Sequence, residues 1–158
     1  GPDGAIQVFT TDPADILIDI SGTFVPESGD GRYHLYPVTP CRVADTRNGP
    51  GPFGGPTMTP SETRSFPLAA GGCAVPSDPN IPRVYVLGAT VVPQGPLSYL
   101  TLFSTSGLQP FVSTLNAFDG AVTSNLALVT GGAGGAVSAF VTDRTDLVLD
   151  VSGFFAVP

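Results

Sequence analysis

The stretch GAGGAVSAFVTDRTDLVLDVSGFFAV, residues 132–157, decides the fold. It holds two short segments rich in β-branched and aromatic residues, 136–142 and 146–155, on either side of a polar turn. Such segments, bounded by glycine and polar residues, are typical of β-strands. Their apolar residues follow no helical period of 3.6 residues. The stretch therefore predicts two consecutive strands at the end of a β domain.

The same pattern opens the sequence. Residues 1–26, GPDGAIQVFTTDPADILIDISGTFVP, align with 132–157 without a gap, and 11 of the 26 positions are identical. Most other positions are conservative, such as Ile16 with Leu147. The offset of 131 residues is the size of one domain. We therefore divide the chain into a terminal two-strand segment (1–26), a linker (27–32) and a complete repeat (33–158).

Short β-rich segments also recur between the two copies, at roughly ten-residue spacing. Glycine and proline, 20 and 17 of the 158 residues, cluster between these segments and mark turns and loops. Strands or extended segments are expected at 5–10, 15–20, 33–36, 38–48, 62–68, 83–92, 97–104, 111–117 and 122–130. The pattern predicts an antiparallel β-sandwich, Ig-like or jelly-roll-like, of about nine to ten strands.

Charge excludes two classes of partner. The net charge is −7, lysine is absent and the six arginines are dispersed, so no cluster of cations could neutralise a nucleic-acid backbone. No basic amphipathic stretch and no apolar run of transmembrane length occur, so membrane insertion is not expected. We expect an extracellular or cell-surface protein.

The two cysteines, Cys41 and Cys73, allow two interpretations. A disulfide would close a loop of about 33 residues and stabilise the fold by roughly 3 kcal/mol. Two buried free thiols are the alternative. The extracellular character of the composition favours the disulfide. No histidine or further cysteine accompanies them, so a zinc site is not expected.

Three stretches resemble a known module. YPVTPCRVADTRNGPGPFGGP (36–56) resembles the opening, FVSTLNAFDGAVTSNLALV (111–129) the middle and TDLVLDVSGFF (145–155) the closing strand of a repeat in large secreted proteins of environmental bacteria. The resemblance covers nearly all of 33–158 and most of 1–26. It implies secretion, modular repetition and a disulfide between the two cysteines, and it implies no reaction.

The densest polar motif is CRVADTR, residues 41–47. It could be a ligand-binding edge. Alternatively, Arg42 or Arg47 pairs with a strand carboxylate such as Asp150, because the arginine fork suits carboxylates. Asp150 stands among apolar residues and needs a partner. We favour structural ion pairs among Arg42, Asp45, Arg47 and Asp150.

Catalysis and metal binding have little support, and we expect no enzyme, no catalytic residue, no metal and no cofactor. His34 is the single histidine, and no GxSxG elbow accompanies it. The glycine-rich stretches do not match a phosphate-binding pattern. Several aspartates could suggest a calcium site, but their spacing is not that of a calcium loop. These aspartates are Asp12, Asp15, Asp19, Asp143, Asp146 and Asp150.

The split repeat predicts a structural subunit of a bacterial extracellular filament or surface fibre that assembles head-to-tail. The chain is then a window of a tandem array, or its N-terminal hairpin completes a neighbour by strand addition. A duplication packed on its own domain is the third interpretation. The partner is another copy of the chain, and the expected interface residues are Ile6, Val8, Ile16, Ile18, Ile20 and Phe24.

A glycan-binding or adhesive module of a secreted protein is the alternative function. Tyr99 and Phe103, on a strand expected at 97–104, could stack on sugar rings. Surface glycans would then be a further partner. Micromolar binding of a glycan by the monomer would favour this function over the filament.

Overall fold

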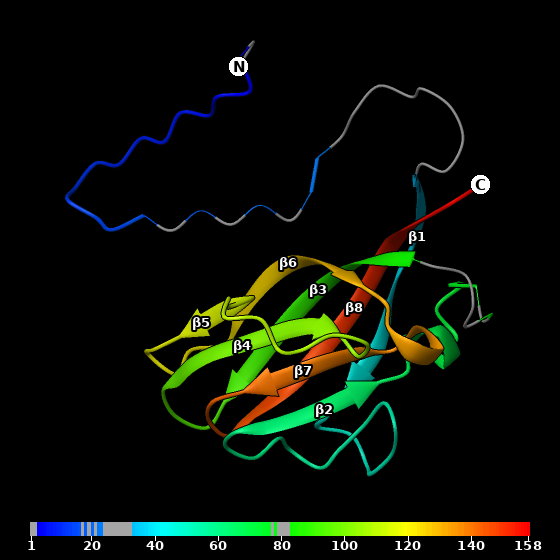
Figure 1. Cartoon of the computed structure of the whole chain (residues 1–158). Helices are drawn as coiled ribbons and strands as arrows, with labels where there is room; N and C mark the ends of the chain where they lie inside the picture. The colour runs from blue at the N-terminus through cyan, green and yellow to red at the C-terminus, as the bar shows by residue number, and fades with distance from the viewer. Residues whose placement is uncertain are drawn as a thin grey trace.

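Two four-stranded antiparallel sheets pack face to face in the computed structural model (Figure 1). The strand order is β1-β8-β3-β6 in the first sheet and β2-β7-β4-β5 in the second. The predicted antiparallel β-sandwich is therefore confirmed. The structure describes residues 3–16, 18, 20, 22–23, 33–76, 78 and 83–158.

Eight strands are formed within the described residues, and two short 3₁₀ turns accompany them. The strands are β1 (His34–Asp45), β2 (Glu62–Phe66), β3 (Arg83–Pro93), β4 (Leu97–Ser104), β5 (Leu115–Ala117), β6 (Thr123–Thr130), β7 (Val137–Val141) and β8 (Thr145–Ala156). The 3₁₀ turns are η1 (Leu68–Ala70) and η2 (Ala133–Gly135).

The core lies between the sheets and follows from the two-residue period of the strands. On β3, alternate side chains from Tyr85 to Val91 are buried, and their neighbours are partly exposed. β8 lies beside β3 in the same sheet, and β7 contributes to the opposite wall from the second sheet. The fully buried apolar side chains of these two strands are Val137, Ala139, Val141, Leu147, Leu149 and Val151.

Strand β1 is longer than the sequence predicts, because two expected segments form one strand of 12 residues. It passes through Pro37 and Pro40, with register shifts between Pro37 and Cys41 and between Arg42 and Ala44. A proline cannot donate to a ladder, but an edge strand needs hydrogen bonds on one side only. β1 lies at the edge of its sheet, which explains why both prolines are tolerated.

Strand β5 is shorter than predicted, covering three residues instead of 111–117. Side-chain hydroxyls replace part of the ladder in the segment before it. The Thr101 hydroxyl donates to the Val112 carbonyl at 2.7 Å, and the Thr114 hydroxyl accepts from the Leu102 amide at 2.8 Å. Residues 111–114 therefore form a loop held against β4, and Phe111 leaves the sheet.

The two strands expected at 5–10 and 15–20 are not formed, since none of the described residues in these ranges belongs to a strand. A two-stranded hairpin without further partners is marginal in water. In the sandwich, the positions that match these strands are held by β7 and β8. Phe24 and the linker 27–32 lie outside the described residues.

Candidate functional site

Cys41 and Cys73 form a disulfide, as expected, with their Cα atoms 5.6 Å apart. Cys41 lies on the edge strand β1, and Cys73 follows η1 in the connection between β2 and β3. The bond therefore fixes β1 to the loop that runs from the second sheet back to the first. Cys73 is buried and belongs to the hydrophobic core.

The CRVADTR motif ends β1 and forms the turn after it. The Asp45 side chain is only 6% exposed, and Arg47 binds it with both arms of its guanidinium. The Arg47 Nε donates to Asp45 Oδ1 at 2.8 Å, and Nη2 donates to Oδ2 at 2.6 Å. These hydrogen bonds lower the pKa of Asp45 below its ordinary value, although burial acts in the opposite direction.

Arg42 binds Asp150 across the β1–β8 pair, where the two residues are register partners. Its Nε donates to Asp150 Oδ1 at 3.0 Å, and its Nη2 donates to Oδ2 at 3.3 Å. Arg42 also lies 3.5 Å from the Asp45 carboxylate. The sequence left Arg42 and Arg47 open as partners of Asp150, and the structure assigns Arg42.

Thr46 joins the motif to β8 and was not singled out in the sequence. Its hydroxyl donates to Asp146 Oδ1 at 3.0 Å and accepts from the Leu147 amide at 2.9 Å. Both Thr46 and Asp146 are buried. Two features of the sequence could have indicated this hydrogen bond: a threonine inside a dense polar motif, and an acidic residue at the start of an apolar strand. Their separation of 100 residues hides the pairing.

These contacts show what the motif can do chemically. No buried side-chain nitrogen or oxygen in the described part of the chain lacks a hydrogen-bond partner. Asp45 and Thr46 are therefore engaged within the fold. The motif locks β1 onto β8, which supports the structural interpretation over a ligand-binding edge.

The other candidate side chains are spread over the fold. Asp143 accepts a hydrogen bond from the Ser98 amide at 3.0 Å, which lowers its pKa. His34 begins β1 opposite Ala156. Within the ranges that the structure describes, no three histidine, cysteine or acidic side chains gather in a group that could hold a metal ion.

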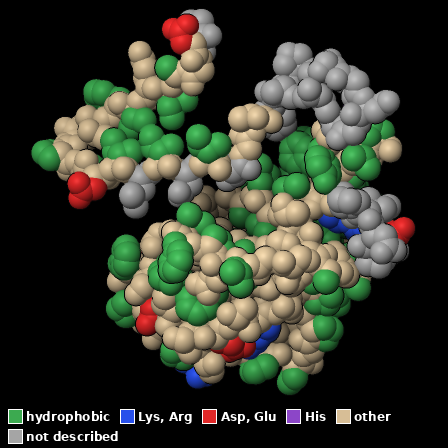
Figure 2. All heavy atoms as spheres, viewed as in Figure 1, with side chains coloured by type: hydrophobic (Ala, Val, Ile, Leu, Met, Phe, Trp, Pro, Cys, Tyr) green, Lys and Arg blue, Asp and Glu red, His purple; other side chains and the backbone are tan. Residues whose placement is uncertain are grey.

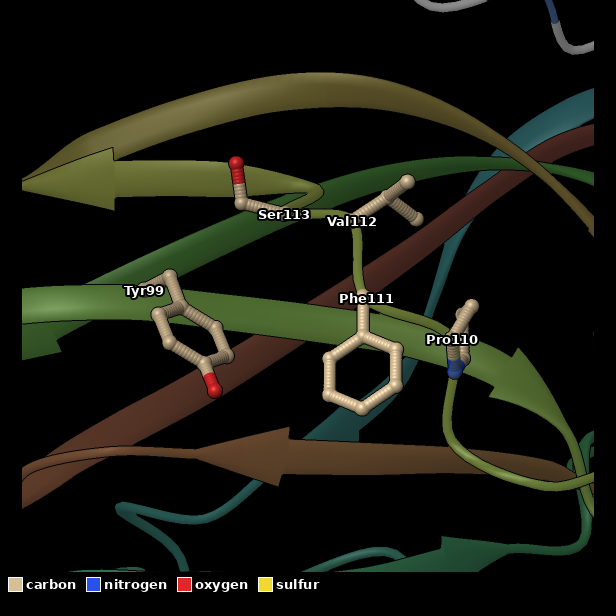
Figure 3. A pocket seen from close by; sticks show the side chains of 5 residues that line it. All are labelled: Tyr99, Pro110, Phe111, Val112 and Ser113. Carbon is tan, nitrogen blue, oxygen red and sulfur yellow. The ribbon is translucent and has the colours of Figure 1, made fainter.

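Tyr99 lines a shallow hollow on the outer face of the second sheet (Figure 3). The hollow has a volume of about 240 Å³, and its other walls come from the segment 110–113. The rings of Tyr99 and Phe111 point to the same side, and Phe111 is fully exposed. Phe140 lies beside Tyr99, with ring centroids 5.7 Å apart. Phe103 does not line this hollow. Phe111 was not predicted to line it, because the sequence does not show that residues 111–114 leave the strand and lie beside Tyr99.

The N-terminal segment carries a row of exposed apolar side chains, visible in Figure 2 along its described part. The exposed fractions run from 51% for Ile16 to 87% for Phe9. The expected interface residues that the structure describes all belong to this row. They are Ile6, Val8, Ile16, Ile18 and Ile20.

No protein-family model, curated protein or solved structure matches the chain. The functional argument therefore depends on the geometry of the sandwich and on the internal repeat. Across the described ranges, we find no helix of the length and apolar character that a membrane span requires.

Proposed function

We propose that this chain is a structural repeat of a bacterial extracellular filament or surface fibre, and that its copies join through residues 1–26. One observation carries the proposal: the same sequence pattern is buried in one copy and exposed in the other. Leu147 and Val151 of β8 are fully buried, whereas the aligned Ile16 and Ile20 are 51% and 84% exposed. A strand pair of this composition is stable only against further strands.

Burial of the exposed row contributes to assembly but does not secure it alone. Burying one such side chain contributes about 1.5–3 kcal/mol, so five of them contribute at most about 8–15 kcal/mol. Association costs about 4–15 kcal/mol in lost rigid-body freedom. The two ranges overlap, so apolar burial alone does not hold copies together. Strand pairing, which adds backbone hydrogen bonds, is therefore the mode of joining that we propose.

Two further features support a structural role outside the cell. The Cys41–Cys73 disulfide fits an oxidising compartment, where such bonds persist. The CRVADTR motif is engaged in holding β1 to β8. The secretion and the bacterial origin in this proposal rest on the family resemblance.

Negative-stain electron microscopy of the native material tests the proposal. We expect regular filaments with an axial repeat set by one domain. A chain that begins at residue 27 should keep its β circular dichroism spectrum, because the segment contributes no strand to the sandwich, and it should form no filaments. Discrete particles from the full chain, or filaments from the shortened one, would contradict the proposal.

Glycan binding is a second candidate, because the half-buried Tyr99 ring and the exposed Phe111 ring point to the same side at this hollow. Aromatic faces of this kind stack on sugar rings. Titration calorimetry of the monomer against a glycan panel tests it. Tyr99→Ala should abolish binding. Phe118→Ala, an exposed aromatic outside the hollow, should not.

A further inference from the structure

The strands β7 and β8 occupy the middle of the two sheets. β7 pairs with β2 and β4, and β8 pairs with β1 and β3. We call the space that these two strands fill the β7–β8 slot. Another strand pair can make the same contacts as β7 and β8 only if one of its strands enters each sheet. A free sheet edge would offer it hydrogen bonds on one side only.

Two side chains in the turn between β7 and β8 hold the start of β4. The Thr142 hydroxyl accepts from the Tyr99 amide at 3.0 Å. The Asp143 carboxylate accepts from the Ser98 amide at 3.0 Å. The slot therefore recognises a threonine followed by an aspartate at this turn.

Two more carboxylates hold β8 to the CRVADTR motif. Asp146 accepts from the Thr46 hydroxyl at 3.0 Å, and Asp150 binds Arg42. The N-terminal segment repeats all four polar residues at the aligned positions, 131 residues earlier in the sequence. These residues are Thr11, Asp12, Asp15 and Asp19.

Glycines mark the slot as well. A Cβ atom at Gly153 would lie 3.0 Å from the Tyr36 carbonyl oxygen, so a side chain on β8 here would press against β1. Gly22 stands at the aligned position, and in its present exposed place a Cβ atom would meet nothing within 4 Å. Gly4 and Gly135, which also align, both have positive φ angles, 72° and 67°. The segment thus keeps a glycine where β8 passes close to β1, and another where the chain has a positive φ angle before β7.

The chain can reach the slot from its N-terminal side. The end of β8 lies beside the start of β1, because Ala156 is the register partner of His34. Val25 aligns with Ala156, and residues 26–33 separate it from His34. Paired Cα atoms of antiparallel strands are about 5 Å apart, and eight residues span far more than this. The segment could therefore fill the slot and turn directly into β1.

The fit of the N-terminal segment is poorer than that of β7 and β8. Val8 would replace Ala139 and Thr10 would replace Val141, both at fully buried positions. An added side-chain volume and a buried hydroxyl each destabilise a packed core. This difference explains why β7 and β8 hold the slot in the structure.

We propose that residues 5–23 are a second occupant of the β7–β8 slot, which closes the sandwich when β8 is displaced. In assembly, residues 5–23 of one copy would enter this slot in another copy, so that the copies join through residues 1–26. The inference deepens the proposed function, and it rests on the assembling role of residues 1–26. It names the receiving site as the interior of the sandwich instead of an edge.

Hydrogen exchange with mass spectrometry on full-length monomers tests the inference. In the unaltered chain, amides of 5–23 should exchange rapidly and those of 145–156 slowly. Gly153→Val brings a side chain against β1 and should reverse this order. Adding Gly22→Val should remove the new protection of 5–23. Gly71→Val is the matched control, since a Cβ atom there would lie 2.2 Å from Val43 Cγ2, outside the slot. It should destabilise the domain without protecting 5–23.

Rapid exchange of 5–23 in Gly153→Val overturns the inference, whether β8 stays in place or the whole domain unfolds. Protection that survives the addition of Gly22→Val overturns it as well. The filament proposal is judged separately by microscopy, because the exchange experiment is run at a concentration where sedimentation shows monomers. If filaments form but residues 5–23 never become protected, the filament proposal holds, and the contact between copies lies outside the β7–β8 slot.

Discussion

Reduction of the Cys41–Cys73 disulfide should lower the melting temperature of the domain by about 14 °C. The two cysteines are 32 positions apart, so the bond closes a loop of 33 residues. In the chain-entropy estimate, closing a loop of this length lowers the conformational entropy of the unfolded chain, which raises the free energy of unfolding by about 3.7 kcal/mol at 25 °C. The entropy of unfolding of a domain of about 126 residues is about 0.26 kcal/mol per degree. Dividing the change in free energy by this entropy gives the expected fall in melting temperature of about 14 °C.

Differential scanning calorimetry of the oxidised protein and of the protein in a phosphine reductant measures the shift. Alkylation and mass determination confirm the redox state of each sample. The double variant Cys41→Ser/Cys73→Ser is the control, because the reductant should leave its melting temperature unchanged. A shift below about 3 °C would refute the reasoning, since it would mean that the unfolded chain gains little freedom when the loop opens.

Three further predictions concern the CRVADTR motif. Arg47→Ala should lower the free energy of unfolding by about 1–3 kcal/mol, because it leaves the buried Asp45 carboxylate without its main partner. Arg144→Ala, which loses only an exposed hydrogen bond, should change it little, and equal effects in urea titrations would contradict the structural role. The pKa of Asp45 lies below its ordinary value of 3.8 in the folded protein, so its contribution is complete above that pH and is lost as the pH falls through the folded pKa. The difference in stability between the unaltered chain and Arg47→Ala should therefore shrink in acid, and a constant difference down to pH 2 would contradict the assignment. Thr46→Val should cost about 1–3 kcal/mol in thermal melts, since Thr46 both donates and accepts in a buried place, whereas Thr46→Ser should cost less.

The central strands could be predicted from the sequence because their burial follows a simple period. Along β3 and β7, every second residue is apolar and faces the other sheet, so the predicted ranges differ from the observed ones by only a few residues. β5 departs from prediction because Thr101 and Thr114 replace ladder hydrogen bonds by side-chain hydrogen bonds. A hydroxyl that competes with the backbone leaves no trace in hydrophobic periodicity.

The ion pairs show where sequence reasoning about a site stops. Four members of the cluster were predicted, but the choice between Arg42 and Arg47 for Asp150 depends on the register of β1 against β8. That register contains two shifts, and a shift of one residue would turn each side chain to the other face. The strands expected at 5–10 and 15–20 need further strands to pair with, and the local sequence pattern does not show whether such partners are present.

The register of β1 against β8 has a mechanical consequence. The first residue of one strand is paired with the last of the other, so a pulling force on the two ends of the domain opens these hydrogen bonds one at a time, as in a zipper. The opening of β1 stops at Cys41, where the disulfide passes the force to Cys73. The residues between them, about 110 Å of extended chain, are never drawn out. Under tension, the first event in each such domain would be the release of residues 34–40 from β8 at low force.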